Sequence, residues 1–110
     1  MDNDLIVKRD VFPDYVKFTI TGRIYSSNAD VFEKHLDKAI EEKSINIILN
    51  MNQVDYISSI GIRVILKIFM EAKKAGGKLS IEMPSDNIRN ILKITALDEM
   101  LIQPYQNGDN

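Results

Sequence analysis

The 110-residue sequence contains no cysteine, no tryptophan and a single histidine, His35. Without cysteine the chain can form neither a disulfide bond nor a thiolate metal site, and one histidine leaves no recognisable zinc site. His35 lies in a segment rich in charged residues, so we expect it on the surface rather than in a catalytic centre. The composition therefore predicts neither a bound metal nor a cofactor.

Long apolar runs and an excess of one charge are also missing. No run approaches the roughly 20 apolar residues that cross a bilayer, and the N-terminal MDNDLIVKRD lacks the layout of a signal peptide. The net charge is -2, with acidic and basic residues interleaved, which argues against a nucleic-acid-binding surface. We expect a cytoplasmic protein with no membrane insertion.

Catalytic motifs are absent too. The phosphate-binding patterns GxxxxGK[ST] and GxGxxG do not occur, and neither does the hydrolase pattern GxSxG. A Ser–His–Asp triad would have to recruit His35. The sequence therefore predicts that the protein is not an enzyme.

Apolar periodicity predicts one α/β domain over residues 1–110, with a core of about residues 5–105. Strands are expected at residues 5–7, 16–20, 45–49, 79–83 and 100–102, and amphipathic helices fill the three longer gaps. The order β-β-α-β-α-β-α-β calls for a mixed, mainly parallel sheet with helices packed on it. Residues 106–110 have nothing to bury and are expected to fray.

Several local signals refine this outline. The strand at 45–49 is nearly all apolar, which is typical of a strand covered on both faces. Ser27 with Asp30 resembles a capping box for the first helix, and Ser85 is the expected cap of the third. In the second helix the core stripe is expected to comprise Ile62, Ile65, Leu66 and Phe69, widened by Val64 and Ile68.

The stretch YISSIG, just before that stripe, interrupts an apolar region with two hydroxyls and a glycine. Ser59 could cap the helix, which explains one serine at a gain of about 1 kcal/mol. A serine at a helix N-terminus is also a sensible phosphate acceptor, because the dipole favours negative charge there. Gly61 fits either a tight strand-to-helix turn or the close approach of a partner.

The run NIILNMNQVDYISSIGIRVILKIFMEAKKAGGKLSI, followed by MPSDNIRNILKITALDEML, resembles the STAS domain. More narrowly it is similar to the bacterial anti-sigma factor antagonists, and YISSIGIRVIL is the most specific part. The resemblance covers about residues 5 to 103. It implies a small sheet with helices on one side, and a role in sequestering an anti-sigma factor with GHKL-type serine kinase activity.

The resemblance also implies site residues. Ser59 corresponds to the serine that the partner phosphorylates, Ser58 is the second choice, and a PP2C-type phosphatase would reset the switch. The implied partner surface comprises Ser58, Ser59, Ile60, Gly61 and Tyr25.

Two alternatives stay open. Tyr25 and Asn50 stand where the family often has aspartate, which favours an unswitched STAS scaffold or a subunit of a complex such as a lipid transporter. A nucleotide or small-molecule sensor could use the N-terminus of the second helix as an anion site.

Overall fold

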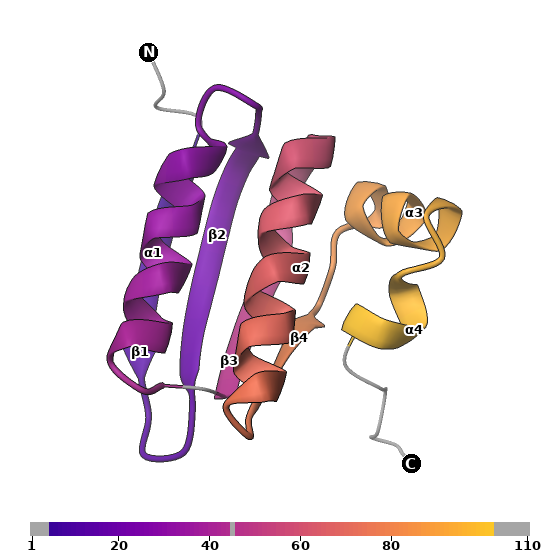
Figure 1. The fold of residues 1–110 in the computed structure, drawn as a ribbon. Helices are drawn as coiled ribbons and strands as arrows, with labels where there is room; N and C mark the ends of the chain where they lie inside the picture. The colour runs from indigo at the N-terminus through magenta and orange to yellow at the C-terminus, as the bar shows by residue number, and fades with distance from the viewer. Residues whose placement is uncertain (1–4, 45, 103–110) are drawn as a thin grey trace.

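The computed structural model describes residues 5–44 and 46–102, which form a four-stranded sheet with helices packed on it (Figure 1). In chain order the elements are β1 (Leu5–Val11), β2 (Val16–Ile24), α1 (Ala29–Glu41), β3 (Asn46–Ile57), α2 (Ser59–Lys74), β4 (Lys78–Glu82), α3 (Asp86–Ile94) and α4 (Asp98–Leu101). The order from β1 to α3 is the order that the sequence predicts.

The sheet is mixed, with the strand order β1-β2-β3-β4. β1 and β2 form an antiparallel hairpin in which Leu5 lies opposite Gly22 and Val11 lies opposite Val16. β2, β3 and β4 run parallel, because α1 and α2 carry the chain back between them. The expected α/β fold with a mixed, mainly parallel sheet is confirmed.

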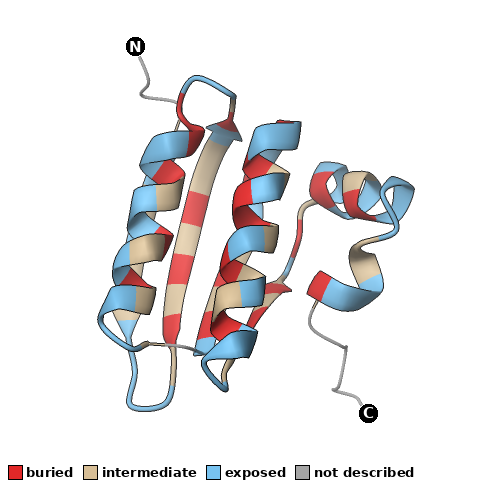
Figure 2. Ribbon diagram, viewed as in Figure 1, coloured by how far each residue is buried: buried red, intermediate tan, exposed pale blue. Residues whose placement is uncertain are grey.

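One face of the sheet carries the core. Both α1 and α2 lie over this face (Figure 1), and Figure 2 shows buried and half-buried positions alternating along β2. The strand side chains buried in this core are Val16, Phe18, Ile20, Ile24, Ile47, Leu49, Met51, Val54, Ile57, Leu79 and Ile81. The expectation that the third strand is covered on both faces is wrong, because Ile48 points to the other face and is only half-buried.

The buried stripe of α2 begins one residue earlier than the sequence suggests. Its fully buried members are Gly61, Val64, Ile65, Ile68 and Ala72. Ile62, Leu66 and Phe69 are half-buried and pack at the margin of the core. The stripe therefore starts and ends on the small residues Gly61 and Ala72, which let the helix lie close to the sheet.

Lys67 of α2 joins the two helices that cover the sheet. Its Nζ lies 2.6 Å from Oε2 of Glu33 and 3.1 Å from Oδ1 of Asp37, both on α1. The hydrogen bond with Glu33 is the main cause that raises the pKa of Lys67 above its ordinary value. The three side chains are partly exposed, so the cluster contributes at most about 1 kcal/mol to stability.

The C-terminal segment differs from the prediction. The strand expected at residues 100–102 is instead the end of α4, and Ile102 makes only an isolated parallel bridge with Ile81. Asp98 and Glu99 lie in the first turn of α4, where the helix dipole favours negative charge. The backbone N–H of Leu101 donates to the oxygen of Leu97 at 3.0 Å, and this turn buries the Leu101 side chain.

Two further expectations concern the ends of the chain and membranes. The fraying expected at residues 106–110 lies outside the described residues. Within residues 5–44 and 46–102, no helix is long and apolar enough to cross a membrane.

We predict that Ile68→Ala lowers the free energy of unfolding by about 2–5 kcal/mol, because this fully buried side chain would leave a cavity under α2. The control is Met70→Ala on the exposed side of the same helix, where 64% of the residue is exposed. That change should stay within about 0.5 kcal/mol. Urea titration of both variants measures the difference, and equal losses would contradict the assigned buried face.

Candidate functional site

The candidate site lies where the parallel strands β2 and β3 end and the chain turns into α1 and α2. This is the upper end of the molecule in Figure 1. The backbone N–H of Ser58 donates to the oxygen of Ile24 at 2.8 Å, so the end of β3 is tied to the end of β2. Ligands of α/β sheets commonly bind at this carboxyl end of the strands.

Ser58, rather than Ser59, caps α2. Its backbone is extended, with φ -77 and ψ 167, and its Oγ accepts a hydrogen bond from the N–H of Gly61 at 3.1 Å. Only 6% of Ser58 is exposed. Ser59 is the first residue of the helix and is exposed to solvent. The expectation that Ser59 provides the cap is therefore wrong, and within the described residues the Ser59 hydroxyl makes no hydrogen bond.

Gly61 allows α2 to pack against the strand ends. A Cβ atom at this position would lie 2.7 Å from Cγ1 of Ile57 and 2.8 Å from Cγ2 of Ile24, closer than side chains tolerate. Of the two explanations left open by the sequence, the close strand-to-helix turn accounts for this glycine. Gly61 belongs to the first turn of α2 and is buried there, on the side that faces the sheet.

Partly exposed apolar side chains lie near the start of α2. The rings of Tyr25 and Tyr56 lie 5.7 Å apart at an interplanar angle of 40°, and Ile60 directly follows Ser59. Tyr56 is 43% exposed and Ile60 is 42% exposed. The structure thus brings Tyr25, Ser59 and Ile60 to an accessible surface, while Ser58 and Gly61 lie beneath it.

Two residues of this surface escaped the sequence reasoning. Tyr56 belongs to β3, which continues to Ile57 rather than ending near Leu49. Asn28 is 1% exposed: its Oδ1 accepts from the N–H of Tyr25 at 2.8 Å, and its Nδ2 donates to the oxygen of Arg23 at 3.1 Å. The loop that carries Tyr25 is therefore held by one buried amide.

The cap expected for α1 is also corrected. Asn28 occupies the N-cap position, and no side chain there bonds to the first turn, so the predicted capping box of Ser27 and Asp30 does not form. Asn28 uses both ends of its amide to bind the preceding loop instead. The cap expected at Ser85 is confirmed, since its Oγ accepts from the N–H of Ile88 at 3.2 Å.

The charges at this end differ from those of the other helices. The first turn of α2 contains no acidic side chain. The first turns of α1, α3 and α4 contain Asp30, Asp86 and Asp98, respectively. Within the described residues no cluster of histidine and carboxylate side chains could hold a metal ion. His35 is exposed on α1. A negative group added at the start of α2 would therefore meet no acidic neighbour in its own first turn.

Comparisons with known proteins agree with this architecture. The family model described as the STAS domain matches residues 7–109. The chain belongs to the STAS domain family.

A relative and several solved structures resemble this STAS domain. A Bordetella bronchiseptica protein named as a candidate anti-sigma factor antagonist, BtrV, is 26% identical over 76 residues. The match covers 69% of this chain and 66% of the relative, slightly less than two thirds of that protein.

Among solved structures, the unphosphorylated form of the anti-sigma factor antagonist SpoIIAA has a TM-score of 0.78 at 15% identity, covering 93% of this chain and 90% of that one. The phosphorylated form of SpoIIAA, from Bacillus, has a TM-score of 0.70 at 16% identity, and the match covers 94% of this chain and 93% of that one. An anti-sigma factor antagonist from Mycobacterium paratuberculosis has a TM-score of 0.82 at 13% identity, and the match covers 97% of this chain and 92% of that one. This STAS domain thus has the fold of the anti-sigma factor antagonists.

Asn50 of this STAS domain lies far from Ser59. It is in the middle of β3, not at its end as the sequence reading placed it. Its Nδ2 lies 3.4 Å from Oε2 of Glu82, whose carboxylate also lies 2.8 Å from Nζ of Lys17. Asn50 therefore belongs to a polar cluster on the sheet face without helices, away from Ser59.

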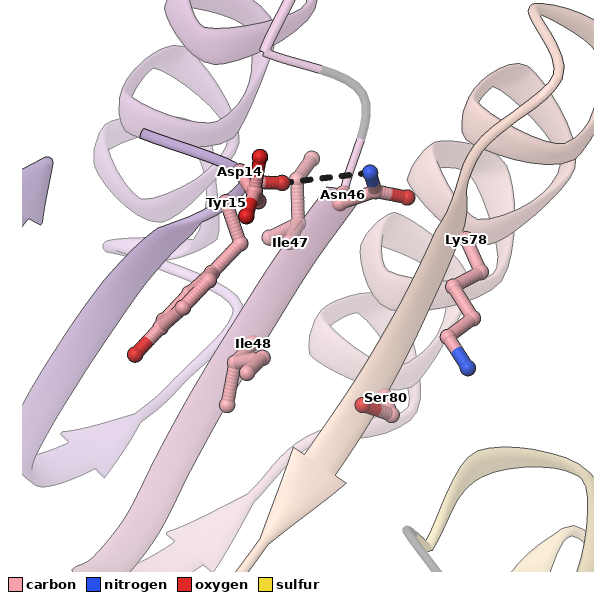
Figure 3. A pocket seen from close by; sticks show the side chains of 7 residues that line it. All are labelled: Asp14, Tyr15, Asn46, Ile47, Ile48, Lys78 and Ser80. Carbon is pink, nitrogen blue, oxygen red and sulfur yellow. Dashed lines mark hydrogen bonds between the residues drawn. The ribbon is translucent and has the colours of Figure 1, made fainter. Parts of the chain in front are cut away.

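A hollow of about 250 Å³ lies on the same helix-free face of the sheet (Figure 3). Its lining residues are Asp14, Tyr15, Asn46, Ile47, Ile48, Lys78 and Ser80. The Nδ2 of Asn46 donates to the backbone oxygen of Asp14 at 3.2 Å, which ties the β1–β2 turn to the start of β3. These elements meet at the end of the sheet opposite Ser59, so the hollow is separate from the candidate site.

The two serines should differ in what they contribute to stability. Ser58→Ala removes the cap of α2 and should cost about 1 kcal/mol, with a range of about 0.5–2 kcal/mol. Ser59→Ala changes an exposed side chain and should stay within about 0.5 kcal/mol. Urea titration measures both values. A larger loss in Ser59→Ala than in Ser58→Ala would show that the cap has been assigned to the wrong hydroxyl.

Gly61→Ala should destabilise the domain, although alanine normally favours a helix over glycine by up to about 1 kcal/mol. The new methyl would press on Ile24 and Ile57, and such overpacking costs about 1–3 kcal/mol. Ile60→Ala, in the same turn but exposed, is the matched control and should have a small effect. Thermal unfolding of both variants is the measurement, and a stabilised Gly61→Ala protein would refute the packing argument.

Proposed function

We propose that this STAS domain is a non-enzymatic, cytoplasmic regulatory module that acts as an anti-sigma factor antagonist. It binds an anti-sigma factor with GHKL-type serine kinase activity, and phosphorylation of Ser59 by that partner releases the complex. A PP2C-type phosphatase resets the switch. The observation that carries the proposal is the division between the two serines: Ser58 is buried as the cap of α2, whereas Ser59 is exposed at its first position.

The surface around Ser59 suits a protein partner. Tyr25, Tyr56 and Ile60 present partly exposed apolar area next to the hydroxyl, and aromatic side chains are enriched where proteins bind one another. The buried hydrogen bonds of Ser58 and Asn28 hold the backbone beneath this surface. A partner would therefore meet a surface that is already ordered, which lowers the entropic cost of binding.

The release step follows from two unequal energies. Within the domain, a phosphate at the start of α2 meets the favourable end of the helix dipole, worth about 0.3–1 kcal/mol. At an interface the same dianion must lose water beside the apolar groups packed on Ile60, and charge that the interface does not neutralise costs several kcal/mol there. Because each 1.4 kcal/mol changes affinity tenfold, we expect a loss of roughly a hundredfold or more. The fold should tolerate the modification, and the complex should not.

SpoIIAA supports a phosphorylation-dependent role, because it has been solved in unphosphorylated and phosphorylated forms. Both forms share the fold of this chain. Binding by an unswitched scaffold is the main competing function, and it predicts equal affinity for both forms.

The test incubates the purified protein with ATP and the GHKL-type kinases of its own organism. We expect one phosphate on Ser59, located by intact-mass measurement and peptide mapping, and none on Ser59→Ala. Ser58→Ala is the control, because it keeps the acceptor and loses only the cap. Phosphate on Ser58, or phosphate that persists in Ser59→Ala, would contradict the assignment.

The switch itself is tested by calorimetry of the partner with each form. We expect the phosphorylated protein to bind at least about a hundredfold more weakly while its melting temperature changes little. Ser59→Asp should weaken binding in part, because it carries less charge and fewer oxygens than phosphate. If the phosphorylated protein instead melts many degrees lower and its folded fraction binds as before, release acts through unfolding and the mechanism is wrong.

A further inference from the structure

Arg63 lies four residues after Ser59 in α2, so the two side chains emerge from the same face of the helix. Both residues are exposed. Within residues 5–44 and 46–102, the guanidinium of Arg63 takes part in no hydrogen bond or ion pair. A cation without a partner is thus placed one helical turn from the proposed acceptor.

None of the carboxylates near this face forms an ion pair with Arg63. Lys67, one turn further along the same face, binds Glu33 and Asp37 of α1, so those two acids already have a cation. The remaining acids of α2 and of the elements packed on it are Asp30 and Glu41 on α1, Asp55 on β3, Glu71 on α2 and Glu82 on β4. Glu82 pairs with Lys17, and none of the five forms an ion pair with Arg63.

We propose that Arg63 holds the phosphate of phosphorylated Ser59 in an ion pair between successive turns of α2. The inference rests on the proposed function for the phosphate itself, and it adds the residue that binds it. An anion followed four residues later by a cation is the favourable order on a helix, because it also matches the helix dipole. The planar guanidinium can donate two parallel hydrogen bonds to phosphate oxygens, which an ammonium group cannot do in the same geometry.

The pairing gives Arg63 a positioning role in the switch. The ion pair holds the phosphate along the surface of α2, towards Arg63, instead of leaving it unpaired near Tyr25 and Tyr56. It also favours Ser59 over Ser58, because a phosphate on the buried Ser58 would start one residue further from Arg63 and beneath the surface. The phosphorylated form should therefore carry a fixed, partly neutralised phosphate.

The experiment places phosphoserine at position 59 of the full chain by genetic encoding, so no kinase or partner is needed. Phosphorus NMR then follows the second ionisation of the phosphate with pH. We expect the pKa of the phosphate to be about 0.3–0.6 unit lower in the otherwise unchanged protein than in Arg63→Gln, because the guanidinium favours the dianion. The difference should shrink in 1 M salt, which screens exposed pairs.

Two variants serve as controls. Lys74→Gln removes the same charge at the far end of α2, about 16 Å along the helix from Arg63, and should leave the phosphate pKa unchanged. Arg63→Lys should recover only part of the shift, since it keeps the charge without the planar donors. The unphosphorylated Arg63→Gln protein should melt as the parent does, because its side chain is exposed.

A phosphate pKa that is the same in Arg63→Gln as in the parent, or one that Lys74→Gln shifts equally, would overturn the pairing. Because the phosphate is installed without a kinase, this result leaves the proposed function standing. Conversely, a phosphate that pairs with Arg63 but does not weaken partner binding would refute the release mechanism and keep the pairing.

Discussion

The close approach of α2 to the ends of β2 and β3 is the constraint on which the site depends. Gly61 leaves no Cβ where Ile24 and Ile57 fill the space, and the N–H of Ser58 bonds to the oxygen of Ile24. Together these contacts set where the first turn of the helix closes. That point decides which serine faces inward as a cap and which faces solvent, so a packing requirement in the core determines the chemistry available at the surface.

The two adjacent hydroxyls thereby have separate tasks. The Ser58 oxygen satisfies a backbone donor that would otherwise lack a partner near the core, and its neighbour makes no contact that the fold needs. A covalent change on Ser59 can therefore alter what the surface binds without removing a bond that holds the helix. The same holds for Arg63, because an exposed and unpaired side chain can bind the phosphate without breaking an existing ion pair.

Most of the fold could be predicted because apolar periodicity records which faces of strands and helices are buried. The prediction from the sequence was wrong where this periodicity is weak. Gly61 and Ala72 begin and end the buried stripe of α2, but glycine has no side chain and alanine only a methyl group, so neither marks the stripe and the predicted one came one residue late. The strand expected at 100–102 is instead the end of the short helix α4, whose first turn carries Asp98 and Glu99, where the helix dipole favours negative charge.

The site itself was located by the YISSIG motif, but its geometry was not. The cap moved from Ser59 to Ser58 because helix starts are set by tertiary packing, and Tyr56 was missed because β3 runs on through register shifts in its pairing with β2. These features depend on the path of the chain in space, which periodicity does not encode.

The amide of Asn28 gives the site one more property. It fastens the loop that bears Tyr25 through neutral hydrogen bonds alone, shielded from water. Because these hydrogen bonds involve no titratable or charged group, changes in pH and ionic strength should leave the conformation of the loop unchanged. Any sensitivity of complex formation to the medium then reports on charges exposed at the contact, which makes salt titration a clean probe of this surface.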